Sequence, residues 1–321
     1  MGPLLNSVAR KIGHYRILKE VGAGGLGQVF KAIDERTGRT VAVKILHQKF
    51  QMSQKRLGYF HRELLIASRL RHKHIVEFVD ANFDPPDCYI VSEFVDGWSL
   101  HYLMKTVRIF PPLVSLAIAI DMLQGIDYLH LHDMIHSDLS SPNVMIDKVG
   151  RVLVTDFGLA AQEDVEDYRN YVVGTPGYYS PEHVSDSPIS VHSDVYCVGL
   201  LIYEMITGTK AVPASRNRQE VIHNMKKIDF SRIKAGERKM QSLLRKLLKS
   251  TLKVSPGRRI ASAEAMVFEI YKILRRYDIR YARYAVHQFL TDRGITAPLA
   301  NTKNQDIYQG FDPELIKGPS S

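Results

Sequence analysis

The chain has 321 residues, of which 45% are hydrophobic and 9% aromatic, enough for a large core or two lobes, and this excludes a disordered chain. Its formal net charge of +9 comes without a nucleic-acid-binding signature, so we expect no nucleic-acid partner. Its two cysteines are too few for a disulfide framework or a zinc site.

The first part of the chain alternates short apolar strands with turn residues. Strands are expected at 16–21, 29–33 and 41–45, and this arrangement predicts an antiparallel sheet. One helix interrupts the strands at 60–70, where apolar residues recur with the three-and-four spacing of an amphipathic helix.

Helical patterns dominate from residue 114 onward, with loops concentrated between 131 and 190. The expected helices lie at 116–130, 192–207, 240–252 and 262–290. The sequence therefore predicts a small β-rich lobe followed by a larger α-rich lobe, with the change of pattern near 94–97.

A glycine-rich run at 22–29 lies between two predicted strands, and its glycines would let a hairpin backbone lie closely over phosphates. A dinucleotide fold would need a helix after the last glycine, but a strand follows here, and then Lys44. Taken alone, the run is also compatible with a bare flexible hairpin.

Lys44 lies on a strand between apolar neighbours, where its ammonium needs an anionic partner, and Glu63 on the following helix can supply one. Further along, Asp138, Asn143 and Asp156 supply three oxygen-bearing side chains in two loops. Asp138 could accept a hydroxyl proton, while Asn143 and Asp156 could hold a divalent cation against phosphates.

This ordered series resembles the eukaryotic-type (Hanks-type) serine/threonine protein kinase family, and most closely its bacterial members. The similarity covers about 12–275 and includes the segment 174–182, where Ser180 replaces the family's alanine. Asp194 resembles the aspartate that braces the catalytic loop. Arg259 resembles the arginine that pairs with Glu182.

The resemblance implies an α+β class and the bilobal protein kinase fold, with a small antiparallel β-rich N-lobe carrying one helix and a larger, mainly α-helical C-lobe. The expected parts are an N-terminal extension, the N-lobe, the C-lobe, a C-terminal helical extension and a flexible tail, at 1–11, 12–95, 96–275, 276–297 and 298–321.

The resemblance also implies the roles of individual residues. The implied catalytic residues are Asp138, Lys44, Glu63, Asn143 and Thr175. The implied ATP-binding residues are Val21, Gly22, Gly24, Gly27, Val29, Ala42, Lys44, Ser92, Glu93, Val95, Met145 and Asp156. Asn143 and Asp156 would hold Mg²⁺, with Mn²⁺ as an alternative. Ser92 occupies the gatekeeper position, where a serine should open a pocket behind the adenine.

Two further residues depart from the family pattern. Ser137 replaces an arginine that receives a phosphate on the activation loop, and residues 158–174 contain no Ser or Thr, so we expect activity that does not depend on Ser or Thr phosphorylation there. Ser140 replaces a lysine that contacts the γ-phosphate, and losing one such donor typically costs about 3 kcal/mol in the barrier.

The expected function is a signalling serine/threonine protein kinase, with ATP and a protein substrate as partners and autophosphorylation as an additional reaction. Thr175 carries the Ser/Thr assignment. A pseudokinase or nucleotide-binding scaffold is the alternative, supported by Ser137 and Ser140. A small-molecule kinase ranks last because such enzymes do not keep the 175–182 segment.

No apolar run reaches the roughly 18 residues of a membrane span, and the N-terminus lacks the order of a signal peptide, so we expect a cytoplasmic location and no membrane span in this chain. The helix at 262–290 is expected to pack on the C-lobe, with a homodimer as the alternative. The basic stretch 226–259 is interpreted as a solvated face, with docking of an acidic partner as the minority interpretation.

Overall fold

The computed structural model describes residues 10–23, 27–47, 64, 68, 70–84, 88–156, 174–185, 187–275 and 279–297, the last range in part by its backbone alone. The chain divides into two compact units at Asp96 and Gly97. Most of the helix expected at 60–70 and the whole tail expected at 298–321 lie outside the described residues.

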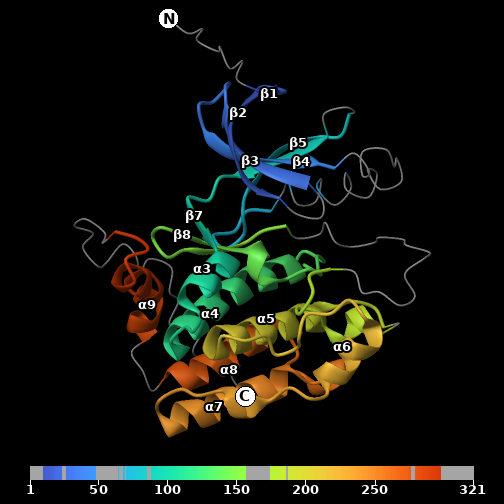
Figure 1. Cartoon of the computed structure of the whole chain (residues 1–321), viewed down its shortest axis with the longest axis vertical. Coiled ribbons are helices and arrows are strands. Elements are labelled where there is room, and N and C mark those ends of the chain that lie inside the picture. The colour runs from blue at the N-terminus through green and yellow to red at the C-terminus, as the bar shows by residue number, and fades with distance from the viewer. Residues whose placement is uncertain are drawn as a thin grey trace, which may run out of the picture. The chain divides into compact units, whose positions relative to one another are not determined.

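Six strands of the first unit form an antiparallel sheet in the order β1-β2-β3-β4-β6-β5 (Figure 1). They are β1 Lys11–Ile12, β2 Tyr15–Ala23, β3 Gly27–Asp34, β4 Thr40–Leu46, β5 Phe78–Asn82 and β6 Tyr89–Glu93. The strands predicted at 16–21, 29–33 and 41–45 are confirmed as β2, β3 and β4.

The turn between β3 and β4 sets the register of the central strands. Gly38 adopts a φ of +71°, which favours glycine, and its N–H donates to the carbonyl of Asp34 at 2.8 Å. The buried Asp34 carboxylate accepts from the Arg36 N–H at 2.9 Å and the Thr37 hydroxyl at 3.0 Å. This closed turn pairs Val29 with Lys44.

The second unit combines a small sheet with helices. The sheet has the order β7-β8-β9, formed by β7 Gly97–Ser99, β8 Val144–Asp147 and β9 Val152–Val154. The helices are α3 Leu100–Val107, α4 Pro112–His130, α5 Val191–Thr207, α6 Arg218–Met225, α7 Arg238–Thr251, α8 Ala263–Leu274 and α9 Ile279–Asp292. Short 3₁₀ turns, η1 Ser141–Asn143, η2 Pro181–Val184, η3 Phe230–Arg232 and η4 Pro256–Arg258, complete it.

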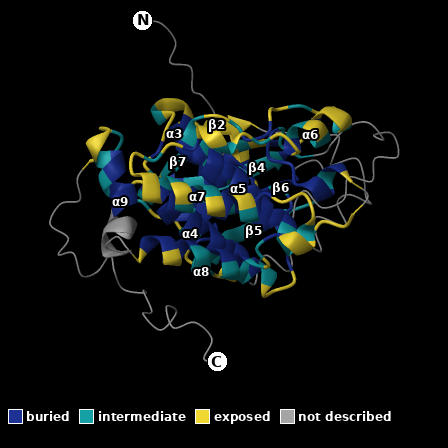
Figure 2. Cartoon of the chain, turned by 90° about the horizontal axis from the view of Figure 1, so that it is seen from below, coloured by how far each residue is buried: buried dark blue, intermediate teal, exposed yellow. Residues whose placement is uncertain are grey.

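Helix α4 forms the centre of the second unit and packs against α5, α8 and α9. Among the described helices it alone is long and apolar enough to cross a membrane by length and composition, and 67% of that apolar window is buried by its neighbours. Figure 2 shows α4 and α5 largely in the colour of buried residues. The first turn of α4 begins at Pro112, four residues before the predicted start, since proline is favoured at the first position of a helix.

The helices predicted at 192–207 and 240–252 are confirmed as α5 and α7, within two residues at each end. The single helix predicted at 262–290 is wrong, because α8 ends at Leu274 and α9 starts at Ile279. The second helix packs on α4, and its Phe289 also packs on Phe110, just before the start of α4, with the ring centroids 5.1 Å apart.

Candidate active site

One buried carboxylate braces the loop 136–143. Asp194 lies in the first turn of α5 and has no exposed surface. Its two oxygens accept the backbone N–H groups of His136 at 2.9 Å and Ser137 at 3.1 Å, and the His130 ring lies 2.8 Å away. The brace that the resemblance assigned to Asp194 is present in this geometry.

Two non-glycine residues of this region adopt left-handed backbone conformations, Ser137 with a φ of +61° and Asp156 with a φ of +58°. Such a conformation costs about 1–3 kcal/mol per residue and persists only where the surroundings enforce it. For Ser137 the surroundings include the Asp194 carboxylate, which accepts hydrogen bonds from the N–H groups of His136 and Ser137. Strain of this kind clusters at functional sites.

The carboxylate of Asp138 is held from two sides. Its Oδ1 accepts from the Thr175 N–H at 3.0 Å and from the Thr175 hydroxyl at 2.8 Å. Its Oδ2 accepts from the Asn143 amide at 3.2 Å, and the same amide donates to the Asp138 carbonyl at 2.9 Å. The structure therefore brings together Asp138, Asn143 and Thr175 from two segments 37 residues apart.

Thr155 connects this loop to Asp156, the next residue in the chain. The Thr155 N–H donates to the carbonyl of Asn143 at 3.0 Å, and its carbonyl accepts from the buried His136 ring at 3.0 Å. The other ring nitrogen of His136 accepts the Asp138 N–H at 3.3 Å. Both backbone groups of Thr155 are thus fixed to the loop that carries Asp138 and Asn143.

The donor set fits a divalent cation. Asn143 gives its amide N–H groups to Asp138, which leaves its Oδ1 as the atom offered to a cation. The side chain of Asp156 adds a carboxylate next to the residue that Asn143 binds. Amide and carboxylate oxygens are the ligands that Mg²⁺ prefers in proteins.

The first unit carries most of the expected nucleotide-binding residues on β2, β3, β4 and β6. Lys44 pairs with Val29 on one side and Ile90 on the other, and Ala42 pairs with Ser92. A Cβ on Gly27 would lie 1.9 Å from the Ile45 carbonyl oxygen, so only glycine fits between these strands.

The remaining expected residues are spread over both units. Val21 and Gly22 lie on β2, Glu93 ends β6, and Val95 is buried just after it. Met145 lies on β8 of the second unit, paired with Leu153. Two further expected residues, Glu63 and Gly24, lie outside the described residues, as does most of the stretch 158–174.

The sequence interpretation missed a polar cluster around Tyr178. The buried Tyr178 hydroxyl donates to Glu204 at 2.7 Å and lies 2.6 Å from the Ser141 hydroxyl, while the Lys210 ammonium lies 3.4 Å from the ring centre. Burial and the negative charge of Glu204 raise the pKa of Tyr178, so the phenol stays neutral. The cluster fixes the 175–182 segment to α5 and to the loop 136–143.

His183 was also missed. One ring nitrogen lies 3.1 Å from the Ser180 N–H and 2.8 Å from its hydroxyl, and the other lies 2.7 Å from the carbonyl oxygen of Ser137. Nothing in the local sequence indicates this contact, because Ser137 and His183 are 46 residues apart.

The Glu182 and Arg259 pair that the resemblance implied is present. Arg259 Nη2 lies 2.6 Å from a Glu182 carboxylate oxygen, and both side chains are almost fully buried. Burial acts to raise the pKa of Glu182, but the hydrogen bonds and charge of Arg259 outweigh it, so the pKa is lowered. The Ser193 hydroxyl adds a bond at 2.9 Å.

Three histidines in or near the loop 136–143 are hydrogen-bonded to protein groups. Among the residues that the structure describes, no group of three or more His, Cys, Asp or Glu could hold a metal ion. His130 contacts Asp194, His132 lies 2.8 Å from the Tyr128 carbonyl, and His136 bonds Thr155.

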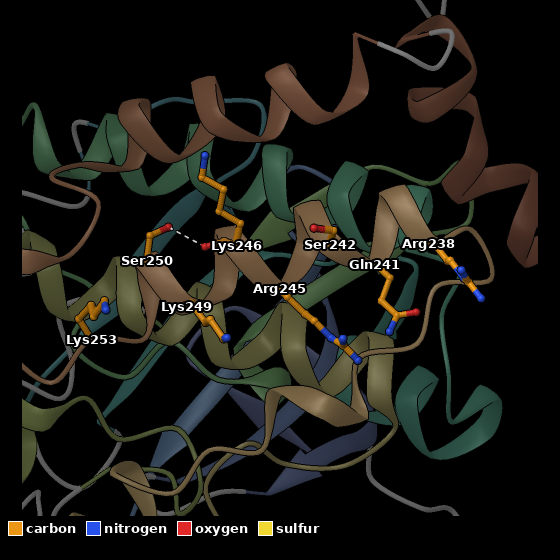
Figure 3. A pocket seen from close by; sticks show the side chains of 8 residues that line it. All are labelled: Arg238, Gln241, Ser242, Arg245, Lys246, Lys249, Ser250 and Lys253. Atoms are coloured by element: carbon orange, nitrogen blue, oxygen red, sulfur yellow. Dashed lines mark hydrogen bonds between the residues drawn. The ribbon is translucent and has the colours of Figure 1, made fainter.

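The basic stretch lies partly on α7, where one face carries the side chains shown in Figure 3. These side chains line a pocket and belong to Arg238, Gln241, Ser242, Arg245, Lys246, Lys249, Ser250 and, just beyond the helix, Lys253. Arg245 turns its guanidinium onto the carbonyls of Phe230, Ser231 and Ile233, at 3.0, 2.9 and 3.2 Å. Lys246 and Lys249 are exposed.

The family of the protein kinase domain matches residues 15–269. The match spans most of the chain, and the chain therefore belongs to this family. The predictions of a bilobal α+β kinase fold and of a Hanks-type serine/threonine kinase domain are confirmed.

Several curated relatives are bacterial serine/threonine protein kinases. The chain is 35% identical to the probable serine/threonine-protein kinase PknB of Lactococcus lactis over 60% of this chain and 31% of the relative. It is 27% identical to the serine/threonine-protein kinase PrkC of Bacillus subtilis over 92% of this chain and 45% of the relative. The chain thus spans less than half the length of these two relatives.

A solved structure shares the fold. The Mycobacterium tuberculosis PknI kinase domain superposes with a TM-score of 0.64 at 21% identity, covering 83% of this chain and 98% of that chain. The family implies the use of ATP and a divalent metal ion, and it implies a protein substrate.

Proposed function

We propose that the chain transfers the γ-phosphate of ATP to Ser or Thr hydroxyls of a protein substrate. The observation that carries the proposal is the Asp138 carboxylate, held between Thr175 and Asn143. A fixed carboxylate of this kind can orient a hydroxyl and accept its proton as phosphate transfer proceeds.

Thr175 supports serine or threonine as the acceptor. Its N–H and hydroxyl both bind one oxygen of Asp138, so the residue that leads the 175–182 segment is joined directly to the proposed base. A substrate segment lying along 175–182 would present its hydroxyl beside Asp138. Positioning of the reacting atoms contributes much of the rate in phosphoryl transfer.

Asn143 and Asp156 are the residues that would hold Mg²⁺, with Mn²⁺ as the alternative. The bound ion would neutralise charge on the phosphate oxygens. The chain's own contribution is to fix both ligands, through Thr155 and through the amide bonds to Asp138.

The first unit is proposed to hold ATP. Lys44 would bind phosphate oxygens with Glu63 as its partner, and Gly22, Gly24 and Gly27 would let the backbone approach them. The remaining proposed contacts to the nucleotide are Val21, Val29, Ala42, Ser92, Glu93, Val95 and Met145. The gatekeeper role of Ser92 is part of this proposal, and competition by ATP analogues with bulky substituents on the adenine tests it.

Ser140 sets the expected speed of the reaction. It is fully buried, and its hydroxyl has no hydrogen-bond partner within the described part of the chain, so it does not replace the missing lysine. We therefore propose slow turnover. The pseudokinase alternative is less favoured because the described partners of Asp138 are in place.

The whole protein's substrate and setting are also proposals. We propose a signalling role with autophosphorylation, in the cytoplasm, with the lobes bounded as 12–95 and 96–275 and a helical extension at 276–297. The homodimer alternative gains no support, because the described apolar residues of α9, including Val286, Phe289 and Leu290, are buried.

The test is transfer of labelled γ-phosphate from ATP and Mg²⁺ to a generic basic protein, comparing wild type with Asp138→Asn. We expect slow transfer by wild type, none above background by the variant, and loss of transfer when EDTA removes the metal ion. Nucleotide binding without any transfer by wild type would contradict the proposal and favour the pseudokinase.

A further inference from the structure

His183 joins two parts of the active site by contacts that the proposed function does not use. We propose that His183 is a positioning residue, which holds the 175–182 segment against the loop 136–143 and fixes the peptide group before Asp138. The inference rests on the proposed function, because it deepens the account of how that site is held.

The contacts define the state of the ring. One nitrogen, Nδ1, faces the Ser180 backbone N–H at 3.1 Å, and a backbone N–H can only donate. Nδ1 must therefore accept, and the ring proton lies on Nε2. The Nε2–H group then donates to the Ser137 carbonyl at 2.7 Å. The neutral Nε2–H tautomer satisfies both contacts at once.

The bond from His183 to the Ser137 carbonyl can affect Asp138 because Ser137 is the residue directly before it. Its N–H is held by the buried Asp194 at 3.1 Å, and its carbonyl is held by His183. The carbonyl belongs to the peptide group that leads into Asp138, so two anchors fix the orientation of the backbone there. Losing either anchor frees the left-handed Ser137, whose φ is +61°.

Ser180, which contacts Nδ1 of His183, also lies in a firmly held part of the chain. Ser180 precedes the turn η2, which contains Glu182, and Glu182 is bound to Arg259. The Ser180 hydroxyl lies 2.8 Å from Nδ1 of His183, so the ring contacts the turn through two groups of one residue. A firmly held segment therefore supports the loop through one imidazole ring.

The hydrogen bond between His183 and Ser137 does not require a phosphate group on the 158–174 stretch. The Ser137 side chain donates to the carbonyl of His136 at 2.7 Å, so it is folded onto its own backbone. The His183 bond uses the carbonyl of Ser137 and is therefore independent of which side chain residue 137 carries. A permanent link of this kind matches a stretch, 158–174, that contains no Ser or Thr.

The first experiment tests the contacts of the two His183 ring nitrogens separately. In His183→Gln the amide reaches the place of Nε2 and can still donate to Ser137. In His183→Asn the shorter amide reaches only the place of Nδ1, and His183→Ala removes both contacts. Each variant is assayed for transfer to a fixed Ser or Thr peptide, with kcat and the KM for ATP measured separately.

We expect His183→Asn and His183→Ala to lose roughly ten- to a hundredfold in kcat, because a small displacement of the reacting groups has effects of that size. His183→Gln should keep most of kcat, and the KM for ATP should stay within about twofold in all variants. The exposed His223 on α6 gives the matched control, since His223→Asn should leave kcat unchanged. Thermal unfolding of each variant shows whether the protein folds, and if His183→Ala does not, the Asn and Gln pair decides.

The second experiment is independent of catalysis. Nitrogen-15 NMR of the histidine rings should show the Nε2–H tautomer for His183, and the Nδ1–H tautomer would overturn the inference.

Equal kcat in the Asn, Gln and wild-type proteins would overturn the positioning role while leaving the proposed function intact. A wild type that transfers no phosphate would remove the proposed function, and the positioning role with it, whatever the tautomer.

Discussion

At the scale of single residues, Glu182 and Arg259 form a buried ion pair in the second unit. The two groups meet at 2.6 Å with side-chain exposures of 2% and 0%. Removing one partner leaves an uncompensated buried charge, which typically costs about 3–5 kcal/mol. We expect Glu182→Gln to lower the free energy of unfolding by about this amount in urea titrations. An exposed pair gives the control, and Glu269→Gln should change it by less than about 1 kcal/mol.

The same pair makes stability depend on pH. Because the pKa of Glu182 is lowered from its ordinary value of 4.5, its stabilisation is fully present above that value and is lost as the pH falls through the lower value of the folded state. The difference in the free energy of unfolding between wild type and Glu182→Gln should therefore be largest at neutral pH and shrink below about pH 4. A difference that stays constant down to pH 3 would contradict this account.

A residue's role could be predicted from the sequence only where it does not depend on partners far away along the chain. Candidate roles for Asp138, Asn143 and Asp156 could be predicted from their ordered spacing in two loops, and these roles stay predictions. Tyr178 and His183 could not, because their partners Glu204 and Ser137 are brought near only by the folded chain. Tyr178 belongs to the recognised 174–182 segment, but that segment does not indicate its contact with Glu204, and His183 lies just outside it.

At the scale of elements, α7 is tied to the preceding turn η3 by one arginine. Arg245 donates to the carbonyls of Phe230, Ser231 and Ile233. We expect Arg245→Ala to cost about 1–3 kcal/mol in thermal or urea unfolding, since it leaves several carbonyls without their donor. The next residue is the matched control, because Lys246 is exposed and Lys246→Ala should stay within about 0.5 kcal/mol. Equal losses for the two variants would contradict this role.

The sequence predicted β2, β3, β4, α4, α5 and α7, but it did not predict β1 or β5 to β9. In β3 and β4, on either side of the turn at Gly38, buried residues alternate with more exposed ones. The break between α8 and α9 was missed because the apolar spacing continues through 275–278 without a proline or glycine. Packing of α9 on α4 overrides that continuous pattern. The eight-residue helices α3 and α6 are too short to give a clear periodic signal.

At the scale of the whole molecule, α9 extends the chain beyond the family match, which ends at residue 269. It is nevertheless built into the second unit, because Phe289 packs on Phe110 and Thr296 donates to the carbonyl of Lys148 at 3.1 Å. We expect Phe289→Ala to lower the free energy of unfolding by about 3–5 kcal/mol, as for other buried aromatics. Tyr102→Ala, at a side chain 52% exposed, is the control for thermal unfolding. A Phe289 variant as stable as the control would show that α9 is dispensable.

The chain is proposed to be a Ser/Thr kinase whose activity does not depend on Ser or Thr phosphorylation within 158–174. The most direct measurement is the initial rate of peptide phosphorylation by phosphatase-treated protein, whose unmodified state is verified by intact mass, with Asp138→Asn as the blank. We predict transfer to Ser or Thr from the first time point, without a lag. Transfer that begins only after the stretch 158–174 becomes phosphorylated, or that never exceeds the blank, would contradict the account.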